Sequence, residues 1–271
     1  MRPEPAHNNY TTAAPDDVQR DGATVQAVLV LLPPSETKRG GGDGPPLRLD
    51  RLAHPALNPL RAELVDELVK LAAEPAAARA ALGLSAQQDA EVARNAELWT
   101  APTVPALHRY TGVLYDALDV GSLRGAAAVR ARRRLAVGSA LFGLLTADDP
   151  VPAYRLSAGS VLPGRGTLAA AWRPALEPVL AAVAARELVV DLRSGSYAAL
   201  ARVPGAVTVT VRTAEGAIVS HFNKAHKGLL ARALVVSRAE PKNLNGLVKV
   251  AKAAGFRVEK TGDRTADLFT G

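Results

Sequence analysis

The sequence predicts a single α/β domain whose N-terminal half is rich in helices. Two unbroken runs of apolar, strand-forming residues, Ala27–Leu32 and Leu188–Leu192, are typical of strands buried in the middle of a sheet. Segments with apolar residues at helical spacing lie between and after these runs, and alternating strands and helices indicate an α/β class. The 271 residues are 48% hydrophobic and 22% charged, so the chain is globular and long enough to bury a large core.

The first half of the chain is predicted to be mostly helical after its opening strand. Prolines end that strand, and a glycine-rich loop follows them. From Ala56 to Leu118 leucines recur at helical spacing, and Leu82-Gly83-Leu84-Ser85 has the pattern of a glycine C-cap followed by a serine N-cap. Leu123–Leu145 is rich in alanine and leucine, and we expect a helix there.

The second half is predicted to alternate between helices and strands. Val207–Val211 alternates valine with threonine, which is typical of a half-exposed strand, and Ile218–Phe222 is its candidate partner. The remaining predicted elements are helices at Trp172–Ala185, Ala225–Val236 and Lys242–Ala254 and a late strand at Phe256–Lys260. No internal repeat is present, so we expect residues 27–271 to form one domain.

The ends and the composition exclude several classes of protein. Met1–Gln26 is polar and interrupted by prolines, and we interpret it as a disordered N-terminal extension. There is no cysteine, which excludes disulfides and thiolate metal sites. No run reaches the roughly 18–20 apolar residues of a transmembrane helix, so we expect a cytoplasmic protein with no membrane partner. The net charge of +7 favours anionic partners, although an arginine-rich composition also reflects genomic base content.

A polar loop follows the first predicted strand and places Ser35, Glu36 and Lys38 together. Such loops at the ends of buried strands often form binding sites. The loop is not a phosphate-binding P-loop, because its glycines follow the lysine instead of preceding it. The alternative is a surface turn with solvated charges.

Two further segments are strongly basic. Five arginines fall between Arg124 and Arg134, and no acidic residue occurs between Asp119 and Asp148 to pair with them. Arginine binds phosphate in a bidentate manner, so this segment is either an anion site or a solvated helix face. The second segment is residues 220–228, SHFNKAHKG, which ends a predicted strand and begins a helix.

The helix start within residues 220–228 is a candidate anion site. Free backbone N–H groups and the helix dipole attract anions there, and Asn223, Lys224 and Lys227 add donors and charge. His221 and His226 are considered as metal ligands, but no Asp or Glu lies near them in the sequence, so no metal site is predicted. The alternative is a plain basic surface.

Two polar turns complete the candidate residues. Arg155 follows a tyrosine in the first turn, and Asp191 and Ser194 belong to the turn after the strand Leu188–Leu192. No G-x-S-x-G motif is present, so these residues do not indicate a Ser-His-Asp triad. We predict that these turns, the loop at residues 35–38 and the segment at residues 221–224 face one cleft.

Five segments in order resemble the YaaA-type peroxide-stress family. They are LLPPSETK at 31–38, YTGVLYDAL at 110–118, LFGLLTADDPVPAYRLSAGS at 141–160, VVDLRSGSYAAL at 189–200 and HFNKAHKGLLARAL at 221–234. The resemblance covers the chain from Ala27 onward. It implies a twisted, mixed β-sheet surrounded by helices, a positively charged cleft that binds DNA, and a role in limiting damage from peroxide and free iron.

The resemblance also implies a helix-hairpin-helix-like element that binds duplex DNA. Its candidate here is the helix ending near Leu82, the following turn and the helix from Gln87, although Asp89, Glu91 and Glu97 make it less basic than expected. The PSETK loop departs from the Ser-Pro-Ala-Lys-Thr loop of enterobacterial members, which indicates a divergent, actinobacterial-style member.

Three functions remain open from the sequence. The first is non-specific binding of duplex DNA, with affinity that falls as salt rises. The candidate anion or DNA contacts are Ser35, Lys38, Arg130, Arg132, Arg133, Arg134, Arg155, Asp191, Ser194, Asn223, Lys224 and Lys227. The second is an enzyme on a small anionic or nucleobase-containing substrate, with Glu36 or His221 as acid or base. The third is a protein-interaction module. No cofactor is predicted. A long open groove favours DNA, and a deep pocket favours the enzyme.

Overall fold

The computed structural model describes residues 27–218 and 223–270. The predicted extension at residues 1–26 lies outside these ranges, as do His221 and the part of the predicted strand after Ile218. Ile218 itself forms an antiparallel bridge with Arg212. None of the helices in the two described ranges is long and apolar enough to cross a membrane.

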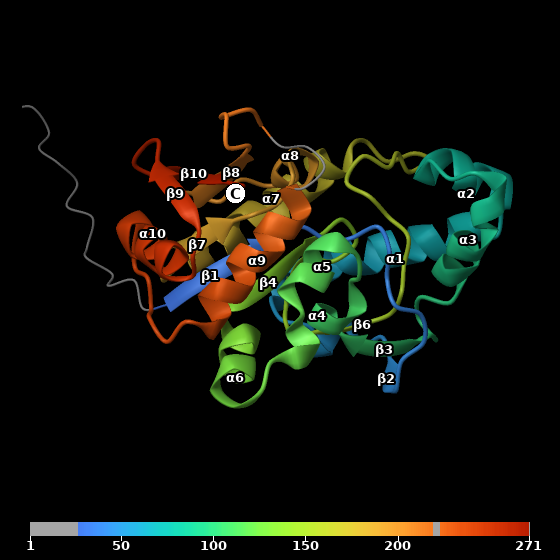
Figure 1. Ribbon diagram of the computed structural model, residues 1–271. Helices are drawn as coiled ribbons and strands as arrows, with labels where there is room; N and C mark the ends of the chain where they lie inside the picture. The colour runs from blue at the N-terminus through green and yellow to red at the C-terminus, as the bar shows by residue number, and fades with distance from the viewer. Residues whose placement is uncertain (1–26, 219–222, 271) are drawn as a thin grey trace, which may run out of the picture.

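The centre of the fold is a mixed seven-stranded sheet with strand order β5-β4-β1-β7-β8-β10-β9 (Figure 1). The five inner strands are parallel to their neighbours, and the edge strands β5 and β9 are antiparallel. The strands are β1 (Ala27–Leu32), β4 (Leu135–Ser139), β5 (Gly143–Thr146), β7 (Glu187–Asp191), β8 (Val207–Arg212), β9 (Arg257–Lys260) and β10 (Thr265–Phe269). This sheet confirms the predicted mixed α/β class.

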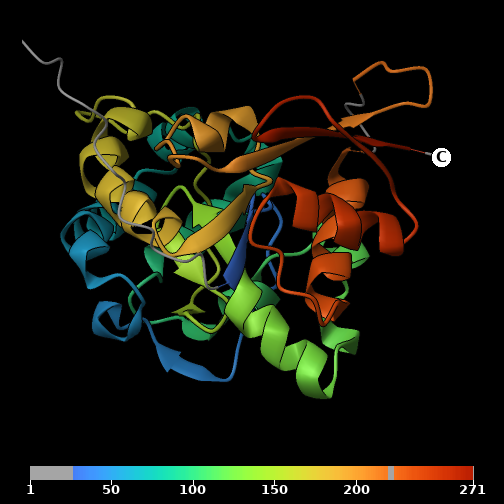
Figure 2. The same cartoon turned by 90° about the vertical axis from the view of Figure 1, so that its left-hand side faces the viewer.

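Helices cover both faces of the sheet, as Figure 2 shows, with α7 on one side and α9 and α10 on the other. The longer helices are α1 (Asn58–Ala72), α2 (Pro75–Leu82), α3 (Asp89–Ala96), α6 (Gly125–Arg134), α7 (Leu168–Ala184), α9 (Asn223–Val236) and α10 (Leu244–Ala253). Shorter elements are α4 (Ala106–Arg109), α5 (Val113–Leu118) and α8 (Gly195–Ala198), with 3₁₀ turns at Leu49–Arg51, Pro55–Leu57, Ala86–Gln88 and Val120–Ser122.

The first strand is central because both of its faces are apolar. Val28–Leu32 is buried, and Val30 pairs in parallel register with Leu135 of β4 and Val190 of β7. A strand buried on both faces needs a continuous apolar run instead of alternation. The predictions of buried strands at Ala27–Leu32 and Leu188–Leu192 are therefore confirmed. The second strand, β7, begins and ends one residue earlier than predicted.

The helix expected over Leu123–Leu145 is wrong beyond Arg134. Residues 135–146 form the antiparallel hairpin of β4 and β5, whose turn is held by the Ser139 hydroxyl accepting hydrogen bonds from two backbone N–H groups. Gly143 has a φ of 71°, and a Cβ there would lie 2.7 Å from the Trp172 ring. Packing in the sheet outweighs the helix propensity of alanine and leucine here.

A second, three-stranded sheet lies beside the main one, in the order β2-β3-β6. Its strands are β2 (Gly44–Pro46), β3 (Pro102–Pro105) and β6 (Pro150–Val151). The sequence did not predict it, because proline is unusual in strands. Buried Arg109 joins its segments by donating to the backbone carbonyls of Gly41, Pro102 and Val151.

The helical hairpin predicted around Gly83 is present as α2 and α3. Gly83 has a φ of 64° and ends α2 in the left-handed conformation that glycine favours. The Ser85 N–H donates to the Gln88 side chain at 3.1 Å at the start of the following turn. Figure 1 shows this hairpin at one end of the molecule, beyond α1.

Candidate anion-binding cleft

A cleft of about 680 Å³ lies at the carboxyl ends of β1 and β7. Its walls are the loop after β1, the loop after β7, and the starts of α5 and α9. The chain leaves β1 toward β4 on one side of the sheet and leaves β7 toward β8 on the other. The crevice between two such strands is where α/β sheets commonly bind ligands.

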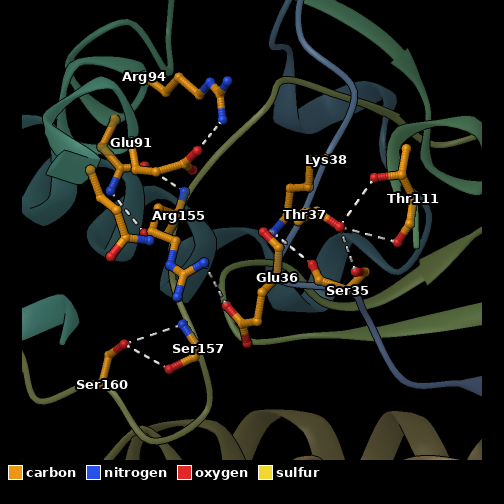
Figure 3. Close-up of polar contacts among 12 residues, drawn as sticks. Ser35, Glu36, Thr37, Lys38, Glu91, Arg94, Thr111, Arg155, Ser157 and Ser160 are labelled. Atoms are coloured by element: carbon orange, nitrogen blue, oxygen red, sulfur yellow. Dashed lines mark hydrogen bonds and ion pairs between the residues drawn. The ribbon is translucent and has the colours of Figure 1, made fainter. Parts of the chain in front are cut away.

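Hydroxyl groups line one wall of the cleft, where the β1 loop meets the segment before α5. Ser35 Oγ lies 3.1 Å from Thr37 Oγ1, and the Thr111 hydroxyl donates to Thr37 Oγ1 at 3.2 Å (Figure 3). Gly112 adjoins them with a φ of 94°, and a Cβ there would lie 3.3 Å from both loop hydroxyls. These groups present a surface that both donates and accepts hydrogen bonds.

Lys38 lies behind this wall, and it does not line the cleft. Its Nζ donates to the backbone carbonyls of Ser35 at 2.9 Å and Glu36 at 3.3 Å, and it lies 4.2 Å from the ring centroid of Tyr154. Burial lowers the pKa of Lys38 to about 8, and the charge of Glu36 opposes that shift. The Lys38 amine therefore holds the β1 loop in its conformation through these two backbone hydrogen bonds.

The lowered pKa of Lys38 predicts a pH dependence of stability. Between pH 8 and pH 10.5 the unfolded chain holds the Lys38 proton and the folded chain does not, so the contribution of Lys38 to stability increases with pH. We expect the free energy of unfolding of the wild type, relative to Lys38→Met, to rise by about 1.5 kcal/mol between pH 8 and pH 9.5. Urea denaturation of both proteins at several pH values measures this difference, and a flat difference contradicts the burial of a titrating amine.

The carboxylate of the cleft is Glu36, and two groups hold it. Arg155 Nη1 lies 3.3 Å from Glu36 Oε2, and the Tyr197 hydroxyl donates to Glu36 Oε1 at 3.4 Å. Burial, with the nearby Glu36 charge, raises the pKa of Tyr197 far above its ordinary value, so this hydroxyl stays protonated and remains a donor. Figure 3 shows Arg155 between Glu36 and the Glu91–Arg94 pair.

The turn after β7 divides into a buried part and an exposed part. Asp191 accepts two hydrogen bonds from the Arg193 guanidinium, at 2.9 and 2.8 Å, and the pair is largely buried. Arg193 lines the cleft, whereas Asp191 lies behind the lining. Arg193 also donates to the carbonyls of Tyr197 and Ala201, which fixes the course of the loop. Ser194 lines the cleft, with its hydroxyl 3.3 Å from that of Ser196.

The start of α9 supplies the positive charge of the cleft. Asn223, Lys224 and Lys227 line it, and the Asn223 Oδ1 atom is buried without a hydrogen-bond partner. Lys224 is exposed, whereas Lys227 is half-buried, donates to the Leu192 carbonyl at 3.0 Å and has a pKa lowered by burial. Lys224 is therefore the more accessible of the two lysines.

The arginine segment lies at the opposite end of α9, roughly 20 Å from the cleft at 1.5 Å per residue. Arg130 donates to the carbonyls of Val235 and Val236 at 2.8 Å each. Arg134 is fully buried and donates to one carbonyl in the last turn of the same helix and to two carbonyls just after it, and Glu240 pairs with it at 2.7 Å. Cations at a helix C-terminus stabilise the helix.

Two more arginines of this segment, Arg132 and Arg133, have carboxylate partners from distant parts of the chain. Arg133 pairs with Glu240, and Arg132 lies 3.6 Å from Asp148. These partners could not be predicted from the sequence, because they are not neighbours of the arginines on the same helix. The side chains of Arg132 and Arg133 are mainly exposed, whereas that of Arg134 is fully buried and cannot contact a phosphate in this fold.

The structure thus brings part of the predicted set together. The cleft lining includes six predicted residues, Ser35, Glu36, Ser194, Asn223, Lys224 and Lys227. Arg155 joins them through Glu36, while Lys38 and Asp191 lie behind the lining. The lining residues that were not predicted as site residues include Thr111, Gly112, Tyr115 and Tyr197. A hydroxyl beside a glycine, as in the YTG and SGSY segments, is the signal that points to them.

Within residues 27–218 and 223–270, no group of three or more His, Asp or Glu residues could hold a metal ion. Glu36 is the one carboxylate among the described lining residues, and Lys224 and Lys227 outnumber it; the third lining cation, Arg193, is paired with Asp191. The arrangement therefore suits an anion that also accepts hydrogen bonds from hydroxyl groups.

Comparison with known proteins identifies close relatives of this chain. The model of one family, described as peroxide stress protein YaaA, matches residues 28–261. A UPF0246 protein from Corynebacterium efficiens is 45% identical over 249 residues, which cover 89% of this chain and 98% of the relative. A UPF0246 protein from Streptomyces coelicolor is 46% identical over 239 residues, which cover 86% and 92%. These relatives agree with the actinobacterial-style branch that the PSETK loop indicates.

Proposed function

Because the chain belongs to the YaaA family of peroxide stress proteins, we propose that it acts in the peroxide stress response by holding DNA phosphates in the cleft. The observation that supports this proposal is the start of α9, where Lys224 and Lys227 line the cleft beside the first helical turn, whose N–H groups have no partner within the helix. The helix dipole adds to the attraction for an anion at this position.

The contacts available in the cleft suit a phosphate backbone more than a particular base sequence. Lys224 is exposed and able to reach a phosphate, and the hydroxyls of Ser35 and Ser194 line the same cavity. Contacts of this kind fix the position of a nucleic acid and carry no sequence information. The net charge of +7 adds a general attraction that salt screens.

Replacing Lys224 by alanine tests the phosphate contact. We expect affinity for duplex DNA to fall about tenfold, as for the loss of one charged hydrogen bond. The slope of log affinity against log salt should fall by about one. Fluorescence anisotropy with a labelled duplex at two salt concentrations measures both values, and Lys224→Glu should give a larger loss.

The matched control is Lys252→Ala, which removes an exposed lysine from α10 that does not line the cleft. This variant should bind as the wild type does. Lys227 is unsuitable for the test, because its hydrogen bond to Leu192 also supports the β7 loop. Equal affinities and equal salt slopes for the wild type and Lys224→Ala contradict a phosphate contact at the start of α9.

An enzyme on a small phosphorylated or nucleobase-containing substrate is a second candidate function. The observation that favours it is the cavity itself, since 680 Å³ falls within the range of about 300–1,000 Å³ that small-molecule sites occupy. In this function Glu36, held by Tyr197 and Arg155, is the acid or base, and Lys224 binds the anionic group.

Thermal denaturation with small ligands separates the two functions. A deoxynucleoside monophosphate at a hundredfold excess over its Kd stabilises a protein by about 2.7 kcal/mol, which is a readily measured shift in Tm. The enzyme proposal expects such a shift with the nucleotide, a smaller one with inorganic phosphate, and none with the nucleotide on Lys224→Glu. Stabilisation by duplex DNA alone contradicts it.

A further inference from the structure

The helical hairpin α2–α3 is connected to the cleft by one side chain. Asn95 on α3 is almost fully buried, and its Nδ2 donates to the Arg155 carbonyl at 2.8 Å. The Arg155 N–H donates to Asn95 Oδ1, also at 2.8 Å. Both hydrogen-bonding groups of the Arg155 backbone are thus occupied by a single amide, which holds that residue in place as a neighbouring strand does.

The Arg155 side chain extends from this fixed backbone to the cleft. Its guanidinium pairs with Glu36, the carboxylate of the lining, at 3.3 Å. The preceding residue, Tyr154, is anchored on the other side by hydroxyl contacts to Tyr110 at 2.9 Å and Ser139 at 2.8 Å. Since its neighbour is fixed in the core, Arg155 has little freedom left once Asn95 is in place.

The α2–α3 hairpin also contacts the segment that follows Arg155 at a second point, and it carries charged residues near the cleft. The Val161 N–H donates to the Ala81 carbonyl at the end of α2, at 3.2 Å. Glu91 and Arg94 form an ion pair on α3. The pKa of Lys38 responds first to burial and then to Glu36, Arg155 and this pair, which therefore lies close enough to influence the β1 loop.

We infer that Asn95 is a positioning residue of the cleft, through which the α2–α3 hairpin sets the place of Arg155 and hence of the Glu36 carboxylate. The hairpin and the cleft then act as one unit, although Asn95 does not itself line the cavity. The inference deepens the proposed function and rests on it only for the identity of the ligand. A purely local role, in which Asn95 stabilises α3 and nothing beyond Arg155, is the alternative.

Hydrogen exchange tests the connection without any ligand. In Asn95→Ala we expect amide exchange to accelerate at least tenfold both in residues 155–161 and in the β1 loop at residues 35–39, where the Arg39 N–H donates to the Arg109 carbonyl. The matched control is Asn58→Ala, because Asn58 also joins backbone and side-chain groups, Leu49 O and Arg61, but does not contact Arg155 or line the cleft. The control should lower Tm and leave exchange at residues 35–39 unchanged. Faster exchange at residues 155–161 alone in Asn95→Ala overturns the inference.

A double-mutant cycle tests the consequence for binding. Asn95→Ala and Arg155→Met are made singly and together, and affinity is measured for a DNA duplex and for a deoxynucleoside monophosphate. If Asn95 acts through Arg155, the Asn95→Ala substitution weakens binding severalfold in the otherwise wild-type protein. In the Arg155→Met protein the same substitution has no further effect on binding. The same fold loss in both backgrounds indicates a general structural role and overturns the inference. If neither probe binds the wild type, the proposed function fails, and hydrogen exchange alone decides the inference.

Discussion

Gly228→Ala is expected to destabilise the protein by about 3 kcal/mol, at the upper end of what an extra methyl group costs in a packed contact. Gly228 lies where α9 crosses α5, and a Cβ there would be 2.2 Å from the Leu114 carbonyl oxygen and 2.9 Å from the Ala117 Cβ. The nearest atom belongs to the backbone, so no side-chain rotation relieves the clash. The two helices must separate, and both form walls of the cleft.

Thermal and urea denaturation measure this loss, which corresponds to a Tm lower by about 6–12 °C for a chain of this size. Gly121→Ala is the control, because nothing lies within 4 Å of a Cβ at that exposed glycine. The control should be neutral or slightly stabilising, since alanine reduces the freedom of the unfolded chain. If Gly228→Ala is as stable as Gly121→Ala, the close crossing of α5 and α9 is wrong.

Arg134→Met is expected to cost about 3 kcal/mol or more. The buried guanidinium donates hydrogen bonds to the carbonyls of Leu234, Ser237 and Ala239 and forms an ion pair with Glu240. Methionine fills much of the same volume but leaves these acceptors without a donor, and removing one member of a buried pair typically costs about 3–5 kcal/mol. Urea denaturation followed by circular dichroism gives the value.

Arg132→Ala provides the comparison for Arg134, because its side chain is 68% exposed and pairs with an exposed Asp148. Such a surface pair contributes at most about 1 kcal/mol, so stability should be nearly unchanged. If the DNA footprint extends from the cleft along α9, this variant should also flatten the salt dependence of binding. An Arg134→Met protein as stable as Arg132→Ala contradicts the structural role assigned to Arg134.

The strands that can be predicted from the sequence are those whose local hydrophobic pattern is compatible with only one type of element. Ala27–Leu32 is continuous and β-prone, and Val207–Val211 alternates, so burial on two faces or on one face follows directly. Leu135–Ser139 begins with leucine and alanine, which favour a helix by composition, and it becomes a strand through its hairpin with β5 and its parallel pairing with β1. That pairing joins residues about a hundred positions apart, so a local pattern cannot reveal it.

The residues of the candidate site likewise divide into those that could be predicted from the sequence and those that could not. Polar residues at the ends of predicted strands, such as Glu36 and Ser194, could be placed in one cleft because parallel strands end at the same edge. The role of the arginine segment could not be predicted, since the carbonyls and Glu240 that occupy it come from the end of α9 and the turn after it. Likewise the burial of Lys38 depends on Tyr110 and Tyr154, which two distant segments bring to it.

The position of β1 in the middle of the sheet has a consequence for the synthesis of this protein. The strand is made first, but its partners β4 and β7 leave the ribosome only after more than a hundred further residues. At about 5–20 residues per second, the apolar AVLVLL segment waits on the order of ten to thirty seconds for β7. During that time both of its edges are open to other nascent chains. A slow translation rate over residues 33–186 should therefore increase aggregation, and a chaperone that binds short apolar segments should reduce it.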